Sequence, residues 1–491
     1  MNIAIIIIYS FFSLFIICYS LVQLSLVYSY LKNRKNIAKQ LEKFSKIEEY
    51  PNITIQLPVY NELYVIERLI DAVANFNYPK DKMEIQVLDD STDETVEIIA
   101  KRTAYWRKKG INISQVIRPK RVGFKAGALD YGMNLCTGEF IAIFDADFVP
   151  EADFLLKTIP YFQDEKIGVV QTKWEHINKE YSLLTRLQAF ALDAHFSVEQ
   201  GGRNFAGHFI NFNGTAGVWR KQAIIDGGGW KADTLTEDLD LSYRAQLYGW
   251  KFLFKEEIGA PAELPAEMNA LKAQQFRWTK GAAECTVKNL GKVMKHNKYA
   301  LWTKINAIFH LMNSFLFIAI FTIAILSIPL FLIKQQHPEL QTFFKFAVIS
   351  LFSFVVIGVM YFTSFSKSYN NKVLAFVHFL YYFPLFLSFS LGLSFHNSIA
   401  VLEGYAGKKS PFVRTPKFSL TKKTGDWKGK KYNKTKIKWV TIVEGILAGY
   451  FIYGIGLCFA WNDYGMLPFF IMLSLGFSVI FIYSIRHSFQ R

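Results

Sequence analysis

The chain has 491 residues, of which 51% are hydrophobic and 16% aromatic, and its formal net charge is +16. This length and composition exclude a single small soluble domain and predict a soluble core joined to membrane segments. The positive charge is a poor sign of nucleic-acid binding, because 12 Lys and Arg gather between 408 and 438, where the only acid is Asp426. Such a loop beside apolar runs is typical of contact with anionic lipid, so we expect membrane lipids and no nucleic acid as partners.

Residues 1–31 contain no charged side chain and are followed at once by Lys32, Arg34 and Lys35. About 20 apolar residues are enough to cross a bilayer. The segment lacks the basic start and the small-residue cleavage site of a signal peptide, so we expect a retained transmembrane helix. The basic residues that follow it predict that the chain from residue 32 onward is cytoplasmic.

Residues 51–260 alternate between short apolar runs and helical patterns, which predicts an α/β domain with a mostly parallel sheet, whose bounds we expect at 50–290. Helices are expected at 64–75 and 92–108. The predicted strands are 53–57, 84–88, 114–117, 140–144 and 168–172.

Residues 301–491 contain five apolar runs, at about 304–333, 343–365, 371–395, 439–461 and 466–486. If all five crossed the membrane, the basic loop 408–438 would lie on the side opposite the α/β domain, against the positive-inside rule. We therefore expect 371–395, which contains Pro384, to lie in the plane of the membrane interface.

Two acidic pairs follow predicted strands. Asp89 and Asp90 close one strand, where a carboxylate can bind a nucleobase or ribose, although a helix cap explains them equally well. Asp145 and Asp147 follow another strand and point to one face of it. Carboxylates placed so, together with substrate phosphate oxygens, suit Mg²⁺ or Mn²⁺, whereas the simpler interpretation is a polar turn with two solvated acids.

Two further clusters lie at helical patterns. Glu237 and Asp238 open a helix, where a carboxylate is either a cap or a general base that takes a proton from an acceptor hydroxyl. Arg277 can grip a diphosphate and Trp278 can stack on a sugar, with Gln274 beside them. An interfacial Arg and Trp pair is the alternative interpretation.

In chain order, these clusters resemble the D, DxD, TED and QxxRW motifs of family 2 glycosyltransferases. The resemblance is to membrane polysaccharide synthases, above all the plant cellulose-synthase-like mannan and glucan-backbone enzymes. The segments 123–128, 170–174 and 212–220 resemble them as well. The resemblance implies a GT-A type α/β domain that binds a nucleotide sugar on a mixed sheet, together with an α-helical transmembrane bundle.

The resemblance also implies a role for each matching residue. Asp238, beside Glu237, would be the base of a single-displacement inversion. Asp145 and Asp147 would hold the diphosphate and Mg²⁺ or Mn²⁺. The other substrate-binding residues would be Asp89, Asp90, Lys125, Trp219, Gln274, Arg277 and Trp278.

The basic loop carries one more resemblance, to the FxVTxK gating loop of cellulose synthase. The matching residues are Phe412, Thr415 and Lys417, while Arg414 stands where the motif has Val. A loop that closes over the nucleotide must face the α/β domain, which agrees with 371–395 not crossing.

Together these features predict an inverting, processive β-glycosyltransferase in a multi-pass membrane protein with a cytoplasmic catalytic domain. It would polymerise hexose from UDP-glucose or GDP-mannose and pass the β-linked polysaccharide through the membrane. The alternative is a non-processive enzyme that adds sugar to a lipid acceptor. A transporter or channel is less favoured, because the apolar runs carry almost no buried charge.

Overall fold

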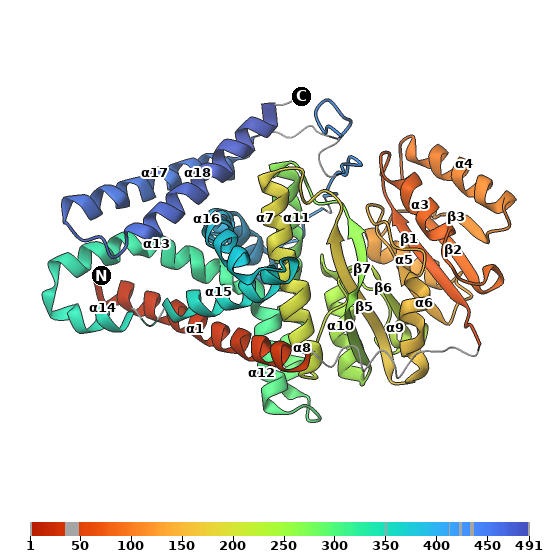
Figure 1. The fold of residues 1–491 in the computed structure, drawn as a ribbon, viewed down its shortest axis with the longest axis horizontal. Helices are drawn as coiled ribbons and strands as arrows, with labels where there is room; N and C mark the ends of the chain where they lie inside the picture. Colours follow the sequence, from red (N-terminus) through yellow and green to blue (C-terminus); the bar gives the residue numbers. More distant parts are fainter. Residues whose placement is uncertain are drawn as a thin grey trace.

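The computed structural model describes residues 2–34, 49–347, 349, 351–411, 413–421, 425–432 and 437–489. An α/β domain and a bundle of long helices lie at opposite ends of the longest axis (Figure 1). The strands of the domain are β1 (Ile53–Val59), β2 (Met83–Asp89), β3 (Ile113–Ile117), β4 (Phe140–Ile143), β5 (Ile167–His176), β6 (Gly217–Arg220) and β7 (Lys251–Ala262). Its α-helices are α3 (Ile66–Ala74), α4 (Thr95–Lys108), α5 (Phe124–Met133), α6 (Phe154–Thr158), α7 (Leu183–Ala194), α8 (Gly201–Phe205), α9 (Lys221–Asp226), α10 (Glu237–Tyr248) and α11 (Met268–Lys295).

The seven strands form one mixed sheet in the order β3-β2-β1-β4-β6-β5-β7. The strands β3, β2, β1 and β4 are parallel, and their register places Val59 opposite Asp89 and Gln56 opposite Ile143. Their carboxyl ends therefore meet at one edge. The antiparallel strand β6 starts at that same edge, where Gly217 pairs with Ile143. The chain just before β6 thus joins the ends of the parallel strands, where ligands bind in open α/β sheets.

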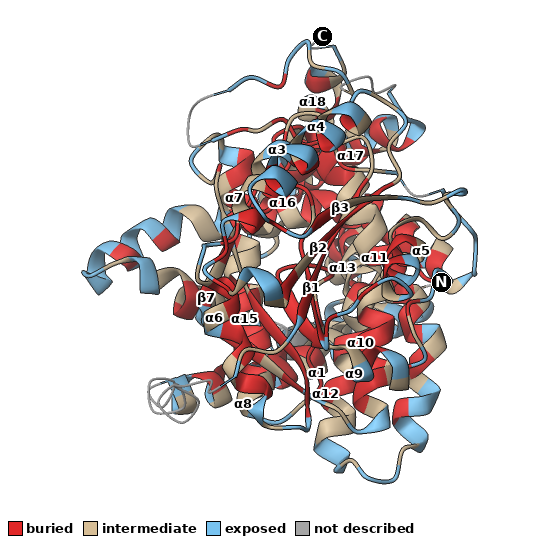
Figure 2. Ribbon diagram, turned by 90° about the vertical axis from the view of Figure 1, so that its right-hand side faces the viewer, coloured by how far each residue is buried: buried red, intermediate tan, exposed pale blue. Residues whose placement is uncertain are grey.

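Both faces of the sheet are covered by helices, which explains the nearly continuous apolar strands of the sequence. Residues of α3, α4 and α6 pack on one face, while α5, α9 and α10 pack on the other. The buried strands lie at the centre, and the exposed residues lie on the outward sides of helices such as α3 and α4 (Figure 2).

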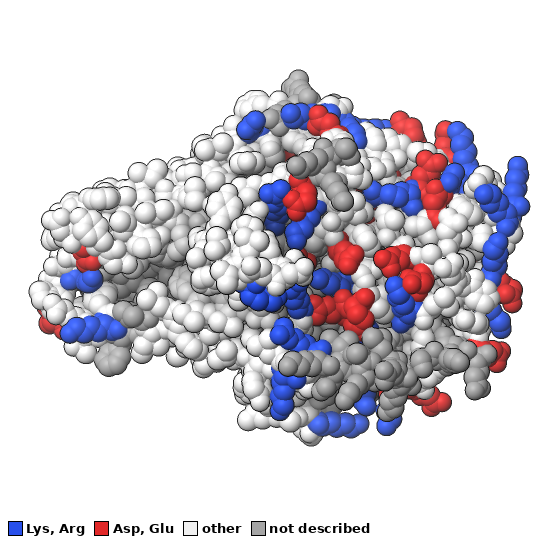
Figure 3. Space-filling model, viewed as in Figure 1, with Lys and Arg blue, Asp and Glu red and all other residues white. Residues whose placement is uncertain are grey.

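The second part of the chain is a bundle of apolar helices. Six helices in the described part of the chain are long and apolar enough to cross a membrane, among them Leu301–Gln336, which combines α12 and α13. Charged side chains gather over the α/β domain, and the bundle shows few of them (Figure 3). The helices of the bundle are α1 (Asn2–Asn33), α12 (Leu301–Leu311), α13 (Phe315–Gln336), α14 (Gln341–Ala347), α15 (Leu351–Phe365), α16 (Lys372–Tyr405), α17 (Trp439–Ala460) and α18 (Leu467–Phe489).

Helix α16 differs from its neighbours, because both of its ends lie against the α/β domain. Just before it, Lys367 forms an ion pair with Glu256 of β7, and near its end Glu403 lies 3.2 Å from Lys280 of α11. Figure 1 looks nearly along α16, whereas α1, α13, α17 and α18 run across the view. The helix therefore lies along the boundary between the domain and the bundle.

Candidate active site

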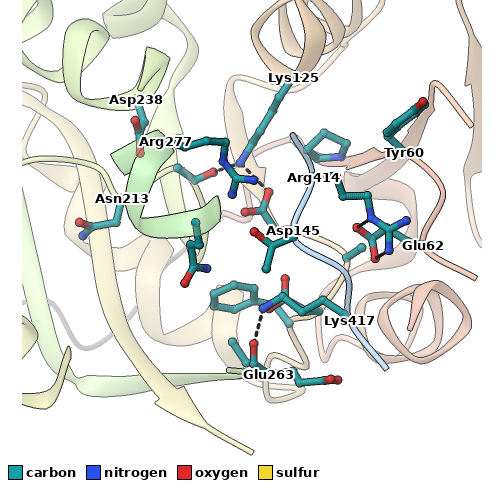
Figure 4. A pocket seen from close by; sticks show the side chains of 18 of the residues that line it. Tyr60, Glu62, Lys125, Asp145, Asn213, Asp238, Glu263, Arg277, Arg414 and Lys417 are labelled. Carbon is teal, nitrogen blue, oxygen red and sulfur yellow. Dashed lines mark hydrogen bonds and ion pairs between the residues drawn. The ribbon is translucent and has the colours of Figure 1, made fainter. Parts of the chain in front are cut away.

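A cavity of about 200 Å³ opens at the edge where the parallel strands end. Its walls come from β1, β4, the segment before β6, the start of α10, one face of α11 and the basic loop (Figure 4). Among the residues that line it are Tyr60, Glu62, Asp90, Arg121, Lys125, Asp145, Asp147, Trp174, His176, Asn213, Glu237, Asp238, Glu263, Gln274, Arg277, Trp278, Arg414, Thr415 and Lys417.

The first feature of the cavity is a lysine held on the first carboxylate of the Asp145–Asp147 pair. Lys125 Nζ donates to Asp145 Oδ1 at 2.5 Å and to the carbonyl oxygen of Gly214 at 2.8 Å. Gly123, which precedes α5, has φ +73°, a conformation that glycine adopts without strain and that starts the helix carrying Lys125. Burial disfavours the ammonium, but the carboxylates of Asp145 and Glu237 outweigh it and raise the pKa of Lys125. Lys125 is thus a fixed positive charge.

The second carboxylate of the pair is held by a lysine from the basic loop. Lys417 Nζ donates to Asp147 Oδ2 at 2.7 Å. The pKa of Asp145 is raised mainly by burial and further by the charge of Asp147, an effect that Lys125 opposes. No group of three His, Cys, Asp or Glu that could hold a metal ion occurs among the described residues. Two carboxylates nevertheless fit Mg²⁺ or Mn²⁺ when substrate phosphates supply further oxygens.

Glu237 and Asp238 begin α10 and reach the cavity from the side opposite β1. Burial raises the pKa of the Asp238 carboxyl, and the charge of Glu237 raises it further. Burial is also the main cause that raises the pKa of Glu237. Asp238 Oδ1 accepts only the adjacent backbone N–H of Leu239, at 2.8 Å, among the described hydrogen bonds. The group is therefore a weakly engaged carboxylate of raised proton affinity, as a general base requires.

Three residues of α11 face the cavity because they lie at positions i, i+3 and i+4 of one helix: Gln274, Arg277 and Trp278. Arg277 Nη1 donates to the carbonyl oxygen of Val413 in the basic loop. The ring of Trp278 lies 6.2 Å from that of Trp174 on β5, centroid to centroid. This wall thus offers a guanidinium beside an aromatic surface of the kind that binds a sugar ring.

At the opposite end, the cavity is lined by the ring of Tyr60 and by the charged groups of Asp90 and Arg121. Asp90 accepts two hydrogen bonds from Arg118, at 2.7 and 2.6 Å. The guanidinium of Arg121 lies 3.3 Å from the ring centroid of Tyr60. A flat cation layered on an aromatic ring is a suitable platform for a nucleobase.

The basic loop closes over the cavity, and we call residues 413–421 and 425–432 the lid segment. Arg414 Nε donates to Glu62 Oε1 at 3.0 Å, and Phe418 N–H donates to Glu263 Oε1 at 2.8 Å. Figure 4 shows Arg414 beside Glu62 and Lys417 next to Glu263. Further along, Tyr432 OH donates to Asp93. The lid segment is therefore docked by hydrogen bonds to acidic side chains that lie just after β1, β2 and β7.

The chain between α16 and the lid segment contacts α11, and we call its residues 406–411 the stem. Lys280 Nζ contacts both Glu403 Oε2, at 3.2 Å, and Ser410 Oγ, at 2.5 Å. Glu403 Oε1 in turn accepts a hydrogen bond from Lys408 at 2.5 Å. The end of α16, the stem and α11 thus share one cluster of contacts.

The structure brings most of the predicted site residues together, with two exceptions. Trp219 does not line the cavity: it is 0% exposed and packs against Phe212, Trp230 and Phe252 in the core. Asp89 does not line the cavity either, because its buried carboxylate accepts hydrogen bonds from Ser91 N–H and Gln115 Nε2. Both side chains are buried beneath the cavity and do not face it. Phe412 lies outside the described residues.

For several cavity residues the sequence predicts no role, although Trp174 lies in the segment 170–174 of the family resemblance. Glu62 and Glu263 bind the lid segment, and His176 and Trp174 form a wall in which His176 Nε2 and Trp174 Nε1 are buried without a hydrogen-bond partner among the described residues. The signal that could have found Trp174 and His176 is their i, i+2 spacing at the end of a predicted strand. Nothing near Glu62 or Glu263 in the sequence indicates a partner in the lid segment.

Comparison with known proteins agrees with this geometry. Residues 51–281 match the model described as "Glycosyltransferase like family 2", so the chain carries a glycosyltransferase family 2 domain. Its relatives include a probable glucomannan 4-beta-mannosyltransferase 2 of Oryza sativa subsp. japonica, 46% identical over 55% of this chain and 47% of that protein. The glucomannan 4-beta-mannosyltransferase 9 of Arabidopsis thaliana is 43% identical over 53% of this chain and 50% of that protein. The match thus spans about half the length of these curated relatives.

Among solved structures, a mannosyltransferase from Pyrobaculum calidifontis in complex with GDP-Man and Mn²⁺ is similar at a TM-score of 0.47 and 16% identity. The match covers 80% of this chain and 100% of that one.

Proposed function

We propose that the protein is an inverting β-glycosyltransferase that extends a polysaccharide from a nucleotide-activated hexose. The observation that carries this proposal is the position of Asp238, a half-buried carboxylate that shares one cavity with Asp145, Asp147 and the Arg277–Trp278 wall. The names of the curated relatives favour a mannosyl donor over a glucosyl donor. GDP-mannose is therefore the first donor to test, and UDP-glucose is the second.

In the proposed reaction the nucleobase lies at the Tyr60 and Arg121 end, and Lys125 and Arg277 hold the diphosphate. Asp238 accepts the proton of an acceptor hydroxyl while that oxygen attacks the anomeric carbon. The bond between the anomeric carbon and the diphosphate oxygen breaks on the opposite face, so the configuration inverts. Asp145 and Asp147 would hold Mg²⁺ or Mn²⁺, which neutralises the negative charge that the leaving diphosphate gains.

The arrangement of the helices supports a topology in which the α/β domain and the lid segment are both cytoplasmic. Both ends of α16 contact that domain, so we propose that α16 lies in the interface and that the other five long helices cross. The loop between α17 and α18 then lies outside. Its Asp463 binds Lys334 at the end of α13, at 2.6 Å, as expected if both helices end on that face.

Passage of the product through the membrane is the most specific part of the proposal. It is supported by the position of Trp278, since α11 carries the sugar-binding wall and also packs along α16 and α18 of the bundle. For example, Lys272 of α11 forms an ion pair with Glu444 of α17 at 2.8 Å. A product chain that leaves the cavity past Trp278 therefore meets the bundle directly.

The product decides between this proposal and transfer to a lipid. Purified protein in lipid vesicles should convert radiolabelled GDP-mannose or UDP-glucose into material that alcohol precipitates and that an endo-β-mannanase or endo-β-glucanase degrades. The variant Asp238→Asn gives the background. Recovery of only a lipid-soluble product that carries one sugar would replace polymer synthesis by lipid glycosylation.

A further inference from the structure

The lid segment places an ammonium group on the carboxylate that is proposed to bind the metal. Lys417 Nζ is 2.7 Å from Asp147 Oδ2, and both side chains are largely buried, with 9% and 13% of their surfaces exposed. Resting on the function proposed above, we infer that Lys417 and a divalent cation compete for Asp147. The docked lid segment thus holds the donor site in a metal-free state.

The charges around Asp147 explain why one cation excludes the other. Lys125 already binds Asp145, so the paired carboxylates are matched by two ammonium groups. A divalent ion would add two further positive charges within a few ångströms of Lys417 Nζ, where like charges repel strongly in a buried site. Each lysine also donates to a backbone carbonyl, but Lys125 belongs to α5 of the α/β domain whereas Lys417 belongs to the lid segment, so Lys417 is the group that can leave.

The size of the cavity also indicates that the docked lid segment hinders binding at the donor site. Its volume of about 200 Å³ with the lid segment docked is smaller than the roughly 300–1,000 Å³ typical of sites for ligands of this size. A nucleotide sugar therefore has little room in the cavity while the lid segment is docked. The lid segment also turns Thr415 inward, and its buried Oγ1 has no hydrogen-bond partner among the described residues. The docked state thus leaves a polar group facing the cavity.

The other contacts of the lid segment allow Lys417 to leave Asp147 without undocking of the whole segment. Lys417 Nζ also donates to the backbone carbonyl of Glu263, whose carboxylate accepts from Phe418 N–H. Arg414 binds Glu62 on the other side. These contacts can remain when the Lys417 ammonium leaves the Asp147 carboxylate. A metal ion can therefore displace Lys417 from Asp147 before the rest of the lid segment moves.

The test measures Mn²⁺ binding directly, without nucleotide and without turnover. The full-length protein in detergent is titrated with Mn²⁺, and the free ion is followed by its electron paramagnetic resonance signal. We expect Lys417→Gln to bind Mn²⁺ about tenfold more tightly than the wild type, a typical size for coupling between two sites. Lys417→Arg keeps the charge and should resemble the wild type.

Two further variants make the result specific. Lys431→Gln removes an equal charge from the lid segment, but its partner Glu94 is exposed, so Mn²⁺ binding should not change. Asp147→Asn should weaken binding in every background. Equal Mn²⁺ affinity in the wild type and Lys417→Gln, or no binding by either, overturns the competition. If Asp147→Asn binds Mn²⁺ as tightly as the wild type does, the metal does not bind Asp147. In that case the proposed metal site is wrong, whatever the result for Lys417.

Discussion

Gly214 and Asp238 meet across the cavity so closely that a β-carbon at position 214 would lie 2.9 Å from Asp238 Oδ2. Gly214 also has φ +79°, and its carbonyl oxygen accepts the hydrogen bond from Lys125. The glycine therefore serves two purposes, since it lets the backbone turn and leaves the carboxylate of Asp238 in place.

Replacing Gly214 should harm catalysis more than stability. In Gly214→Ala the new methyl group displaces the Asp238 carboxylate, so we expect the rate of sugar transfer to fall by about 10²-fold, as misplacement of a reacting group does. Gly207→Ala is the matched control, because Gly207 has φ +66° with nothing within 4 Å of an added β-carbon. Both variants should lose similar thermal stability, measured by Tm. Equal loss of transfer in both would show that strain alone is responsible.

Asp238 itself should be needed for transfer and not for binding. Removal of a positioned base typically costs about 10²–10⁴ in rate, so Asp238→Asn should lose at least that while its affinity for the nucleotide stays near wild type. Isothermal titration with the nucleoside diphosphate and a transfer assay separate the two effects. If binding and turnover fell together, Asp238 would be a structural cap of α10.

The pH profile should report the influence of Glu237 on Asp238. The base acts as a carboxylate, and its pKa is raised by burial and by Glu237. Turnover should therefore fall as the pH falls, beginning at a higher pH than an ordinary aspartate would give. In Glu237→Gln one of these causes is gone, so the acid limb of kcat against pH should move to lower pH. A limb that stays in place would assign the titration to another group.

Removal of divalent ions should stop the reaction. We expect excess chelator to abolish transfer and Mg²⁺ or Mn²⁺ to restore it. The variants Asp145→Asn and Asp147→Asn should lose at least about 10²-fold in rate, as the loss of one electrostatic contact to the leaving group commonly does. Circular dichroism should show that both variants still fold. Full turnover in the presence of chelator would contradict the metal site.

The topology can be tested with single cysteines in a cysteine-free background. Cysteines at Lys108 in the α/β domain and at Lys409 after α16 should react with an impermeant thiol reagent from the same side. A cysteine at Tyr464, between α17 and α18, is expected to react from the other side. All three positions are exposed in the structure, so access to solvent does not bias the comparison. Opposite labelling at Lys108 and Lys409 would mean that α16 crosses.

The five strands expected from the sequence are confirmed. Four of them are apolar runs that are largely buried in the sheet, whereas β3 is a half-exposed strand at its edge. Two strands were missed for physical reasons. β6 has only four residues, and β7 carries Lys255, Glu256 and Glu257 in its middle, which breaks any apolar run. Because β6 runs antiparallel, the sheet is mixed, as the family resemblance implied and the strand patterns alone did not.

The site was predictable where its residues are local in sequence. Glu237 and Asp238 open the expected helix, and Asp145 follows the expected strand. Contacts between distant segments were not predictable: Arg414 and Glu62 lie 352 positions apart, and Lys417 and Asp147 lie 270 apart. The position of Trp219 in the core was not predictable for a different reason, since sequence similarity cannot tell an aromatic side chain that stacks on a ligand from one that fills the core.

The contacts of Lys280 determine where the lid segment can pivot. In the proposed opening of the lid segment, Lys280 would keep its contacts with Glu403 and Ser410, so the chain up to Ser410 would stay in place while the part that carries Arg414 and Lys417 moves. Trp278 lies two residues away on the same rigid helix, so it stands on the stationary side of this hinge. In the proposed reaction, the spent nucleotide would leave through the open side while the end of the product stays on Trp278. That separation is what repeated addition to one chain requires.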